Sequence, residues 1–333
     1  MSKKKRHDGT TVNSYLVRRP IKRWAPLFII PTFLCFIIGF IWPFIQGIYL
    51  SFCKFMTPKD AELTLIPALE KMEKNPALVE EAGGKFSYYM KGLFQNYIRA
   101  FEDPSFSRAF WNTALFAVVS IVLINVIAFA IAYALTQKLR GSNLFRTVFF
   151  MPNLIGGVVL GYIWSMIFDG ILAKCGTYLT ANSTYGFWGL VILVAWQQIG
   201  YIMIIYIAGL QAVSEDMLEA AKIDGANSRQ TLFRVTIPNV MPSITICTFL
   251  TLTNSFKMFD QNMALTGGDP TITLATGEQI KGTELLALNI FSTYKINRNW
   301  HGVAQAKAVI FFLLVAVLAI AQLSATRRKE VQQ

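Results

Sequence analysis

Charged residues are scarce in this chain. Only 15% of its 333 residues are Asp, Glu, Lys or Arg, and 54% are hydrophobic. A typical soluble domain has about 25% charged residues, so the composition excludes an ordinary soluble domain and indicates a membrane protein. The net charge of +12 would suit nucleic-acid binding, but the basic residues gather at the ends of apolar segments. They therefore indicate membrane topology, and no nucleic-acid partner is expected.

Histidine and cysteine are also scarce, and their positions argue against hydrolase and metal sites. The two histidines, His7 and His301, are predicted on opposite sides of the membrane, so zinc or Ser/His chemistry within the bilayer lacks its side chains. No metal site and no catalytic residue are expected. A disulfide between Cys53 and Cys175 stays an open alternative. Otherwise the four cysteines are interpreted as unpaired packing residues: Cys35, Cys53, Cys175 and Cys247.

Long apolar runs are what the sequence does contain. A bilayer-spanning helix needs about 20 mostly apolar residues, because no water satisfies the backbone there. The fifth of six candidate runs is the weakest, since polar residues from 254 to 262 interrupt it. The sequence therefore predicts an all-α polytopic membrane protein with six transmembrane helices, at residues 27–51, 109–135, 145–168, 187–210, 241–265 and 303–323.

Lysine and arginine cluster in the N-terminal tail, in the connection around residues 138–146 and at the C-terminus. The positive-inside rule assigns such segments to the cytoplasm, so both termini are expected there. With six crossings, the connection 212–240 is expected in the cytoplasm too. The predicted organisation is a basic tail 1–24, a first transmembrane helix 25–53, an external loop with an insertion 54–108, a transmembrane core 109–326 and a cytoplasmic tail 327–333.

The connection 212–240 has the signals of a helix-turn-helix. Ser214 is a suitable N-cap, and two acidic residues follow it in the first turn. The helix is expected to stop at Gly225, and Asn227 or Ser228 to cap a second short helix. Pro238 is expected to prevent that helix from running unbroken into the fifth span.

Within this connection, "EAAKIDGANSRQTLFRVTIP" (219–238) resembles the hallmark of inner-membrane permeases of ATP-binding-cassette (ABC) importers. That hallmark is Glu-Ala-Ala, three residues, Gly, nine residues and Ile-x-Leu-Pro. The resemblance implies a coupling loop, with Asp224 included, that docks into a separate ATPase subunit. Small alanines suit close seating, and a carboxylate suits a basic partner group. The matching positions are Glu219, Ala220, Ala221, Gly225 and Pro238, with conservative departures at Val235 and Ile237.

Flanking segments narrow the resemblance to the carbohydrate-uptake branch of this family, over residues 93–325. The branch implies a bacterial or archaeal plasma membrane, a second homologous permease, two cytoplasmic ATPases and an extracytoplasmic sugar-binding protein. ATP and Mg would then bind the ATPases, and this chain would need no cofactor. The segments that carry the resemblance are "NYIRAFEDPSFSRAFWNT" (96–113), "MPNLIGGVVLGYIW" (151–164), "YIAGLQAVSEDMLEAAKIDGA" (206–226) and "FDQNMALTGGDP" (259–270).

Residues 57–92 depart from this branch, because they make the first external loop longer than expected. Apolar residues at helical spacing predict short helices at 63–72 and 75–82, punctuated by Pro67 and Pro76. The hypothesis for this insertion is that it shapes a docking surface for the binding protein.

An alternative class is a self-sufficient ion-coupled carrier or membrane enzyme. A carrier is expected to have two homologous halves with interrupted helices at matching places, and no such repeat is visible. "GEQIKGT" (277–283) approaches a phosphate-binding loop but has no lysine after Gly282, so ATP hydrolysis is expected on a partner.

Polar residues in the fifth span are the first candidates for a substrate path, because each is costly in hydrocarbon. Asn254, Lys257 and Gln261 are spaced to share one helical face, and Asp260 is within reach of Lys257. Such groups suit sugar hydroxyls. A structural pairing of Lys257 with Asp260 is the open alternative.

Aromatic residues are the second set of candidates, because rings stack on the apolar faces of sugars. Trp196 is a candidate for stacking on the sugar, and Gln197 and Tyr201 are spaced to form one wall of the path. Trp164 is interpreted as part of the outer interfacial belt. Lys307 is predicted to extend its ammonium to the outer interface.

Overall fold

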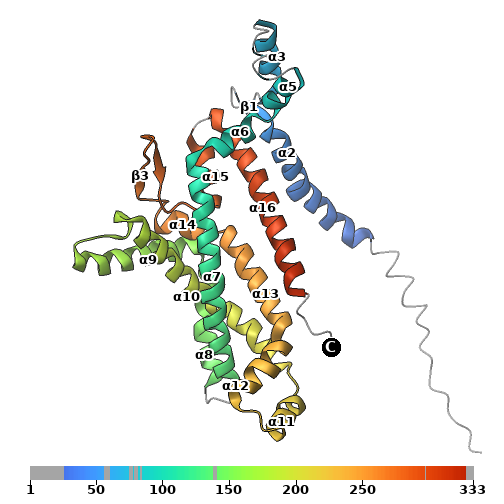
Figure 1. Cartoon of the computed structure of the whole chain (residues 1–333), viewed down its shortest axis with the longest axis vertical. Helices are drawn as coiled ribbons and strands as arrows, with labels where there is room; N and C mark the ends of the chain where they lie inside the picture. Colours follow the sequence, from blue (N-terminus) through green and yellow to red (C-terminus); the bar gives the residue numbers. More distant parts are fainter. Residues whose placement is uncertain are drawn as a thin grey trace, which may run out of the picture. The chain divides into compact units, whose positions relative to one another are not determined.

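The computed structural model describes residues 26–55, 61–74, 78, 82, 85–137, 141–296 and 298–327. They belong to two compact units, Met1–Leu50 and Ser51–Gln333. Most basic residues behind the predicted orientation lie outside the described residues. Within the described part, six helices are long and apolar enough to cross a membrane, which confirms the all-α fold (Figure 1): Pro26–Ser51, Pro104–Thr136, Gly157–Cys175, Ser183–Gln211, Ser228–Phe256 and His301–Ala325.

The described part of the first unit is one long apolar helix, Pro26–Ser51, whose last residue already belongs to the second unit. It contains a π-helical turn, η1 (Ile37–Ile41), ahead of α2 (Trp42–Ser51). The rings of Phe36 and Phe40 stack with centroids 5.2 Å apart. Most of its large apolar side chains are exposed, as lipid contact requires of a spanning helix.

The core of the second unit lies among α7 (Pro104–Thr136), α10 (Ser183–Gln211) and α13 (Ile237–Phe256), which pack against one another. The buried residues of α7 include the small side chains Ala117, Ala128 and Ala132, which let the helix backbones approach closely. The buried cluster includes Phe116, Ile124, Ala128, Ala132, Leu193, Met203, Tyr206 and Cys247.

A buried polar chain also joins these three helices. The Tyr206 hydroxyl donates to Asn125 Oδ1 at 2.7 Å, and Asn125 Nδ2 donates to Thr251 Oγ1 at 3.2 Å. Because water is absent from the bilayer core, these groups must satisfy one another. These hydrogen bonds between Tyr206, Asn125 and Thr251 therefore set the register of α7, α10 and α13.

The third predicted span, residues 145–168, is wrong as a single helix. α8 (Ser142–Phe150) passes into a 3-10 turn, η2 (Met151–Leu154), and α9 begins after two residues of extended backbone and runs over Gly157–Leu172. Pro152 contributes to the break because it has no backbone N–H to continue the helical ladder. The spanning helix of this region therefore begins at Gly157.

α9 packs against α14 (Asp260–Leu265). A Cβ added to Gly161 would lie 2.5 Å from the Cβ of Ala264, so only glycine permits this approach. Two short 3-10 turns, η3 (Ala173–Cys175) and η4 (Leu179–Ala181), lead from α9 to α10.

The fifth predicted span, residues 241–265, is displaced. The helix begins at α12 (Ser228–Thr231) and continues through a π-helical turn, η5 (Leu232–Thr236), into α13, which ends at Phe256. The expected break at Pro238 is wrong, because this proline lies in the first turn of α13. The wider π turn has already shifted the hydrogen-bond ladder, with the first N–H of α13 bonded five residues back.

The connection between the first two spans is folded in its described part. Its helix α3 confirms the helix predicted near residues 63–72, whereas most of the one predicted at 75–82 lies outside the described residues. The elements are an antiparallel hairpin of β1 (Cys53–Phe55) and β2 (Ala61–Leu63), then α3 (Leu65–Lys74), α5 (Lys85–Leu93) and α6 (Gln95–Glu102).

A second antiparallel hairpin, β3 (Thr271–Thr273) with β4 (Gln279–Lys281), follows α14. The chain then forms α15 (Leu286–Ile296), a 3-10 turn η6 (Arg298–Trp300) and α16 (His301–Arg327). α16 packs against α6, α13 and α15. This packing brings the last helix back to the polypeptide that precedes α7.

Candidate functional site

An open pocket of about 310 Å³ lies where α10, the end of α13 and the start of α14 meet. Five residues predicted from sequence for a substrate path come together here: Asn254, Lys257, Asp260, Gln261 and Gln197. The full lining is Asn153, Gln197, Gln198, Asn254, Lys257, Met258, Phe259, Asp260 and Gln261.

The reason for this clustering differs from the predicted one. α13 ends at Phe256, and Lys257 forms its C-cap, with a backbone N–H donated to Thr253 O at 3.2 Å. A new helix starts at Asp260. The single helical face predicted for residues 254–261 is therefore wrong, and a turn between two helices gathers the polar residues instead.

Lys257 and Asp260 do not form the ion pair that was the structural alternative. The salt bridge found among the described residues joins Lys307 to Asp103, elsewhere in the chain. Both Lys257 and Asp260 are exposed. Both side chains are therefore available at the pocket.

Two glutamines tie the pocket walls together. Gln261 Nε2 on α14 donates to Gln197 Oε1 on α10 at 2.8 Å, and Gln197 Nε2 donates to Ile155 O at 3.1 Å. A Cβ added to Gly157 would lie 2.8 Å from Gln261 Cδ, so a larger residue there would push the amide aside. The residues around the break before α9 therefore position both glutamines, because Ile155 accepts from Gln197 and Gly157 leaves room for Gln261.

Sequence reasoning missed four pocket residues, the polar Gln198 and Asn153 and the apolar Met258 and Phe259. The side-chain oxygen of Gln198 is buried and has no hydrogen-bond partner among the described residues. Two features of the sequence could have indicated the polar ones. Gln198 is the second of two adjacent glutamines in an apolar helix, and Asn153 directly follows the helix-breaking Pro152.

Trp196 and Tyr201 do not line this pocket. Trp196 points away from Gln197 because consecutive residues on a helix face different directions, and its ring meets Trp164 at 5.4 Å in a T-shaped contact. Tyr201 packs against the hydrophobic core cluster. These two aromatic residues of the predicted path therefore lie apart from its polar residues.

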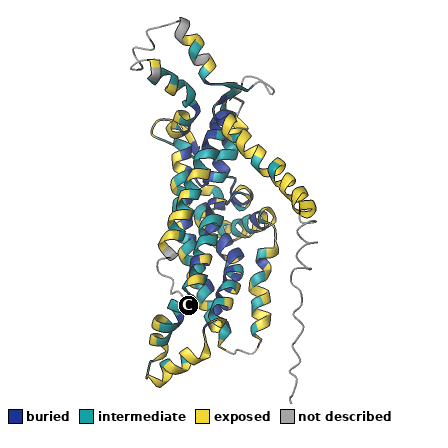
Figure 2. Cartoon of the chain, turned by 90° about the vertical axis from the view of Figure 1, so that its right-hand side faces the viewer, coloured by how far each residue is buried: buried dark blue, intermediate teal, exposed yellow. Residues whose placement is uncertain are grey.

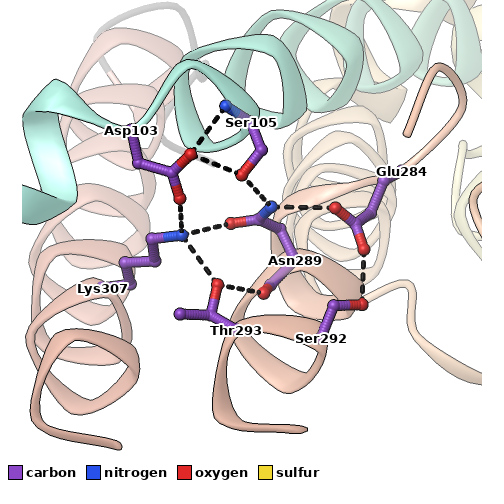
Figure 3. A network of polar contacts seen from close by, with 7 residues as sticks. All are labelled: Asp103, Ser105, Glu284, Asn289, Ser292, Thr293 and Lys307. Carbon is purple, nitrogen blue, oxygen red and sulfur yellow. Dashed lines mark hydrogen bonds and ion pairs between the residues drawn. The ribbon is translucent and has the colours of Figure 1, made fainter. Parts of the chain in front are cut away.

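The prediction that Lys307 reaches the outer interface is wrong. Its side chain is wholly buried, and its ammonium donates to Asp103 Oδ2 at 2.5 Å, Asn289 Oδ1 at 3.0 Å and Thr293 Oγ1 at 2.7 Å (Figure 3). All three ammonium protons are thus used, as a buried charge requires. The partners come from the start of α7 and from α15, so sequence separation concealed them.

Asp103 also caps α7, since its Oδ1 accepts from the backbone N–H of Ser105 at 2.9 Å and from its hydroxyl at 2.7 Å. Burial by itself would raise the pKa of the Asp103 carboxyl. The charge and hydrogen bond of Lys307, with the bonds from Ser105, outweigh burial and hold that pKa below its ordinary value.

The polar network continues from Asn289 to Glu284. Asn289 Nδ2 donates to Glu284 Oε2 at 2.8 Å, and Ser292 Oγ donates to Glu284 Oε1 at 2.5 Å (Figure 3). The backbone on either side of Glu284 bonds to Asn262 of α14. Asn262 Nδ2 donates to Thr283 O, and Leu285 N–H donates to Asn262 Oδ1, both at 3.0 Å. The network thereby holds α14, which carries one wall of the pocket.

The connection 212–240 forms the predicted helix-turn-helix. Ser214 Oγ accepts from the N–H of Met217 at the start of α11 (Glu215–Ile223). Gly225 follows with φ of +78°, a conformation that favours glycine. Of the two possible caps for α12, the structure selects Asn227, which exchanges bonds of 2.9 and 2.8 Å with Gln230.

This helix-turn-helix presents an exposed surface (Figure 2). Glu219, Ala220, Asp224 and Gly225 are exposed and Ala221 is half-buried, whereas Pro238 is half-buried within the continuous helix beyond. Large apolar side chains are exposed beside them, Ile223 at 86% and Phe233 at 66%. Exposed apolar groups beside charged ones are typical of a surface that binds a protein partner.

The model of the family "Binding-protein-dependent transport system inner membrane component" matches residues 140–331. A probable starch degradation products transport system permease protein, AmyD of Thermoanaerobacterium thermosulfurigenes, is 39% identical over 318 residues, which are 93% of this chain and 96% of AmyD. The chain belongs to this family. It is a transport subunit in a membrane, and the resemblance found in the sequence is confirmed.

Further comparisons agree with this family. The multiple sugar-binding transport system permease protein MsmF of Streptococcus mutans is 27% identical, and the match covers 93% of this chain and 97% of MsmF. A crystal structure of a bacterial ABC transporter that imports the acidic polysaccharide alginate has a chain of the same fold, with a TM-score of 0.68 at 17% identity over 94% of this chain and 99% of that chain.

As a binding-protein-dependent permease, the chain is a transport subunit and not an enzyme. Family membership and six apolar helices make it a multi-pass protein of the plasma membrane. Permeases of this family carry no cofactor of their own.

Proposed function

We propose that this chain is one permease of an ATP-driven ABC importer and forms, with a second homologous permease, the path for a di- or oligosaccharide. An extracytoplasmic binding protein delivers the sugar. The substrate class is supported by relatives that carry starch degradation products and multiple sugars, as their names state. It is also supported by a pocket rich in amide side chains.

The observation that carries the energy-coupling part is the exposed turn at Gly225 with the small, charged helix before it. Ala220 leaves the helix surface low enough for a partner to seat closely, and Glu219 offers a carboxylate to a basic group. Two cytoplasmic ATPases, each with ATP and Mg, bind such loops on the two permeases. Both chain termini then lie in the cytoplasm, by the positive-inside rule.

The pocket at the end of α13 is the part of the sugar path that this chain contributes. Its amides present donors and acceptors to hydroxyl groups, and Phe259 supplies an apolar ring. Movement of the ATPases would change access to this pocket by stabilising one of two states of the permease pair.

Reconstitution tests the proposal. The importer is purified from native membranes through a tag on this chain and placed in liposomes with the binding protein and radiolabelled maltotriose. We expect the ATPase to co-purify, and uptake to require both ATP and the binding protein. Uptake by the permeases without any ATPase would instead establish a self-sufficient carrier.

A further inference from the structure

We infer that the pocket beside Lys257 selects uncharged sugars over anionic ones, such as sugar phosphates and uronates. This inference rests on the proposed function, because it treats the pocket as part of the substrate path. It goes further by naming the charge class of the substrate. The relatives do not decide this, since the importer of similar fold carries an acidic polysaccharide.

The charges that line the pocket cancel. Lys257 and Asp260 are the only ionisable residues among the described residues that line it, and they carry opposite signs. No ion pair joins them, although every residue from 141 to 296 is described. An anion drawn to the ammonium of Lys257 therefore meets the carboxylate of Asp260 across the same opening.

The remaining polar lining consists of neutral amides. There are five of them: Asn153, Gln197, Gln198, Asn254 and Gln261. An amide offers both a donor and an acceptor, and so does each sugar hydroxyl, so every hydroxyl finds a complementary group. A carboxylate or phosphate oxygen can only accept, so an amide oxygen that faces it has no donor.

Gln198 strengthens this argument because its hydrogen-bonding capacity is unused. The side chain is 8% exposed, and its oxygen has no partner in the part of the chain that the structure describes, whereas the amide of neighbouring Gln197 bonds to Gln261 and Ile155. A buried acceptor without a donor is unfavourable. Rotation of the Gln198 amide toward the pocket would let a hydroxyl supply that donor, which an anionic oxygen cannot do.

The test compares two probes that differ by one carboxylate. Maltotriose is neutral, and its uronate, in which C6 of the non-reducing glucose is oxidised and every ring is kept, carries one negative charge at pH 7. Saturation-transfer NMR titrations use the complete importer in nanodiscs without the binding protein, so that its own selectivity does not enter. We expect maltotriose to bind at least about fivefold more tightly, the effect of roughly one hydrogen bond.

Two charge variants give opposite expectations. Asp260→Asn leaves Lys257 unopposed and should reduce the preference for maltotriose by about fivefold, while Lys257→Gln should increase it. Damage to the fold would instead weaken the binding of both probes by the same factor and leave their ratio unchanged. Glu278→Gln removes an exposed carboxylate from the β3–β4 hairpin, outside the pocket, and should leave the ratio unchanged.

Equal or tighter binding of the maltotriose uronate to the unmodified importer would overturn the inference. So would a ratio that moves in the same direction in both charge variants. If neither probe binds, the pocket is not a sugar site and the inference fails, but ATP-dependent uptake still decides the proposed function independently.

Discussion

Gln261 and Gln197 are 64 residues apart in the chain and share a hydrogen bond of 2.8 Å between their side-chain amides. The bond joins α14 to α10 across the pocket. Because the chain interrupts its helix at residues 257–259, Gln261 can turn toward α10 and does not continue the line of α13. The same interruption leaves Lys257 and Asp260 at the opening.

Loss of the Gln261 amide should change substrate handling and leave assembly intact. In Gln261→Ala, one hydrogen bond worth about 1 kcal/mol is lost at the pocket, which corresponds to about a fivefold change. We expect that shift in the sugar concentration that half-stimulates ATP hydrolysis, and the same direction for Asn254→Ala. Gln305→Ala, on α16, is the matched control. Unchanged kinetics in both pocket variants would contradict a site here.

The turn at Gly225 should be essential for ATPase binding. Valine is strongly disfavoured at φ of +78°, although a Cβ there would meet no neighbouring atom within 4 Å. We expect Gly225→Val to insert and express normally, to lose co-purified ATPase and to transport nothing. Glu219→Ala should be milder, with a loss of about 1.5–3 kcal/mol of binding.

Gly277→Val is the control for backbone strain, because Gly277 has φ of +83° with the same open surroundings but lies in the β3–β4 loop. It should keep its ATPase. Normal transport by Gly225→Val would remove the basis for a coupling role of residues 219–238.

Removal of the Lys307 ammonium should destabilise the protein. Lys307→Met leaves the Asp103 carboxylate without its buried partner, a change that typically costs about 3–5 kcal/mol. We expect a clear fall in the thermal unfolding midpoint of the purified complex, and partial recovery when Asp103→Asn is added. Lys174→Met replaces an exposed lysine and should have little effect. A double variant as unstable as Lys307→Met alone would argue against the pair.

The contribution of the Asp103 carboxylate to stability should not vary with pH near neutrality. The pKa of the Asp103 carboxyl is lowered from 3.8 in the folded protein, so its stabilising effect is present above that value and is lost as pH falls through the lower folded pKa. The difference in unfolding midpoint between Asp103→Asn and the unmodified protein should therefore be constant from about pH 5 to 8. A difference that shrinks within this range would contradict the assignment.

The membrane orientation can be measured by labelling single cysteines in a cysteine-free background. Lys85 in α5 and Glu219 in α11 are both exposed. An impermeant maleimide should label Lys85→Cys in intact cells and Glu219→Cys only after the cells are opened. Labelling of both sites from one side would contradict the predicted topology.

Local signals in the sequence determined much of this protein. Composition and apolar run length determined an all-α membrane fold with six spanning helices, because backbone groups in lipid must bond within their own helix. The turn after α11 was equally predictable, since Ser214, Gly225 and Asn227 act on neighbouring backbone groups. The polar residues of the pocket were recognised as a group, although their supposed helical face does not exist.

Tertiary structure alone decided how distant residues meet. The break at residues 257–259 contains neither proline nor glycine, and it lets α14 pack against α9, where Gly161 has no room for a side chain. Lys307 was read as an interfacial residue because its partner, Asp103, is 204 positions away. A buried charge is stabilised by the groups that the fold places beside it, and the hydropathy of one helix cannot identify groups on other helices.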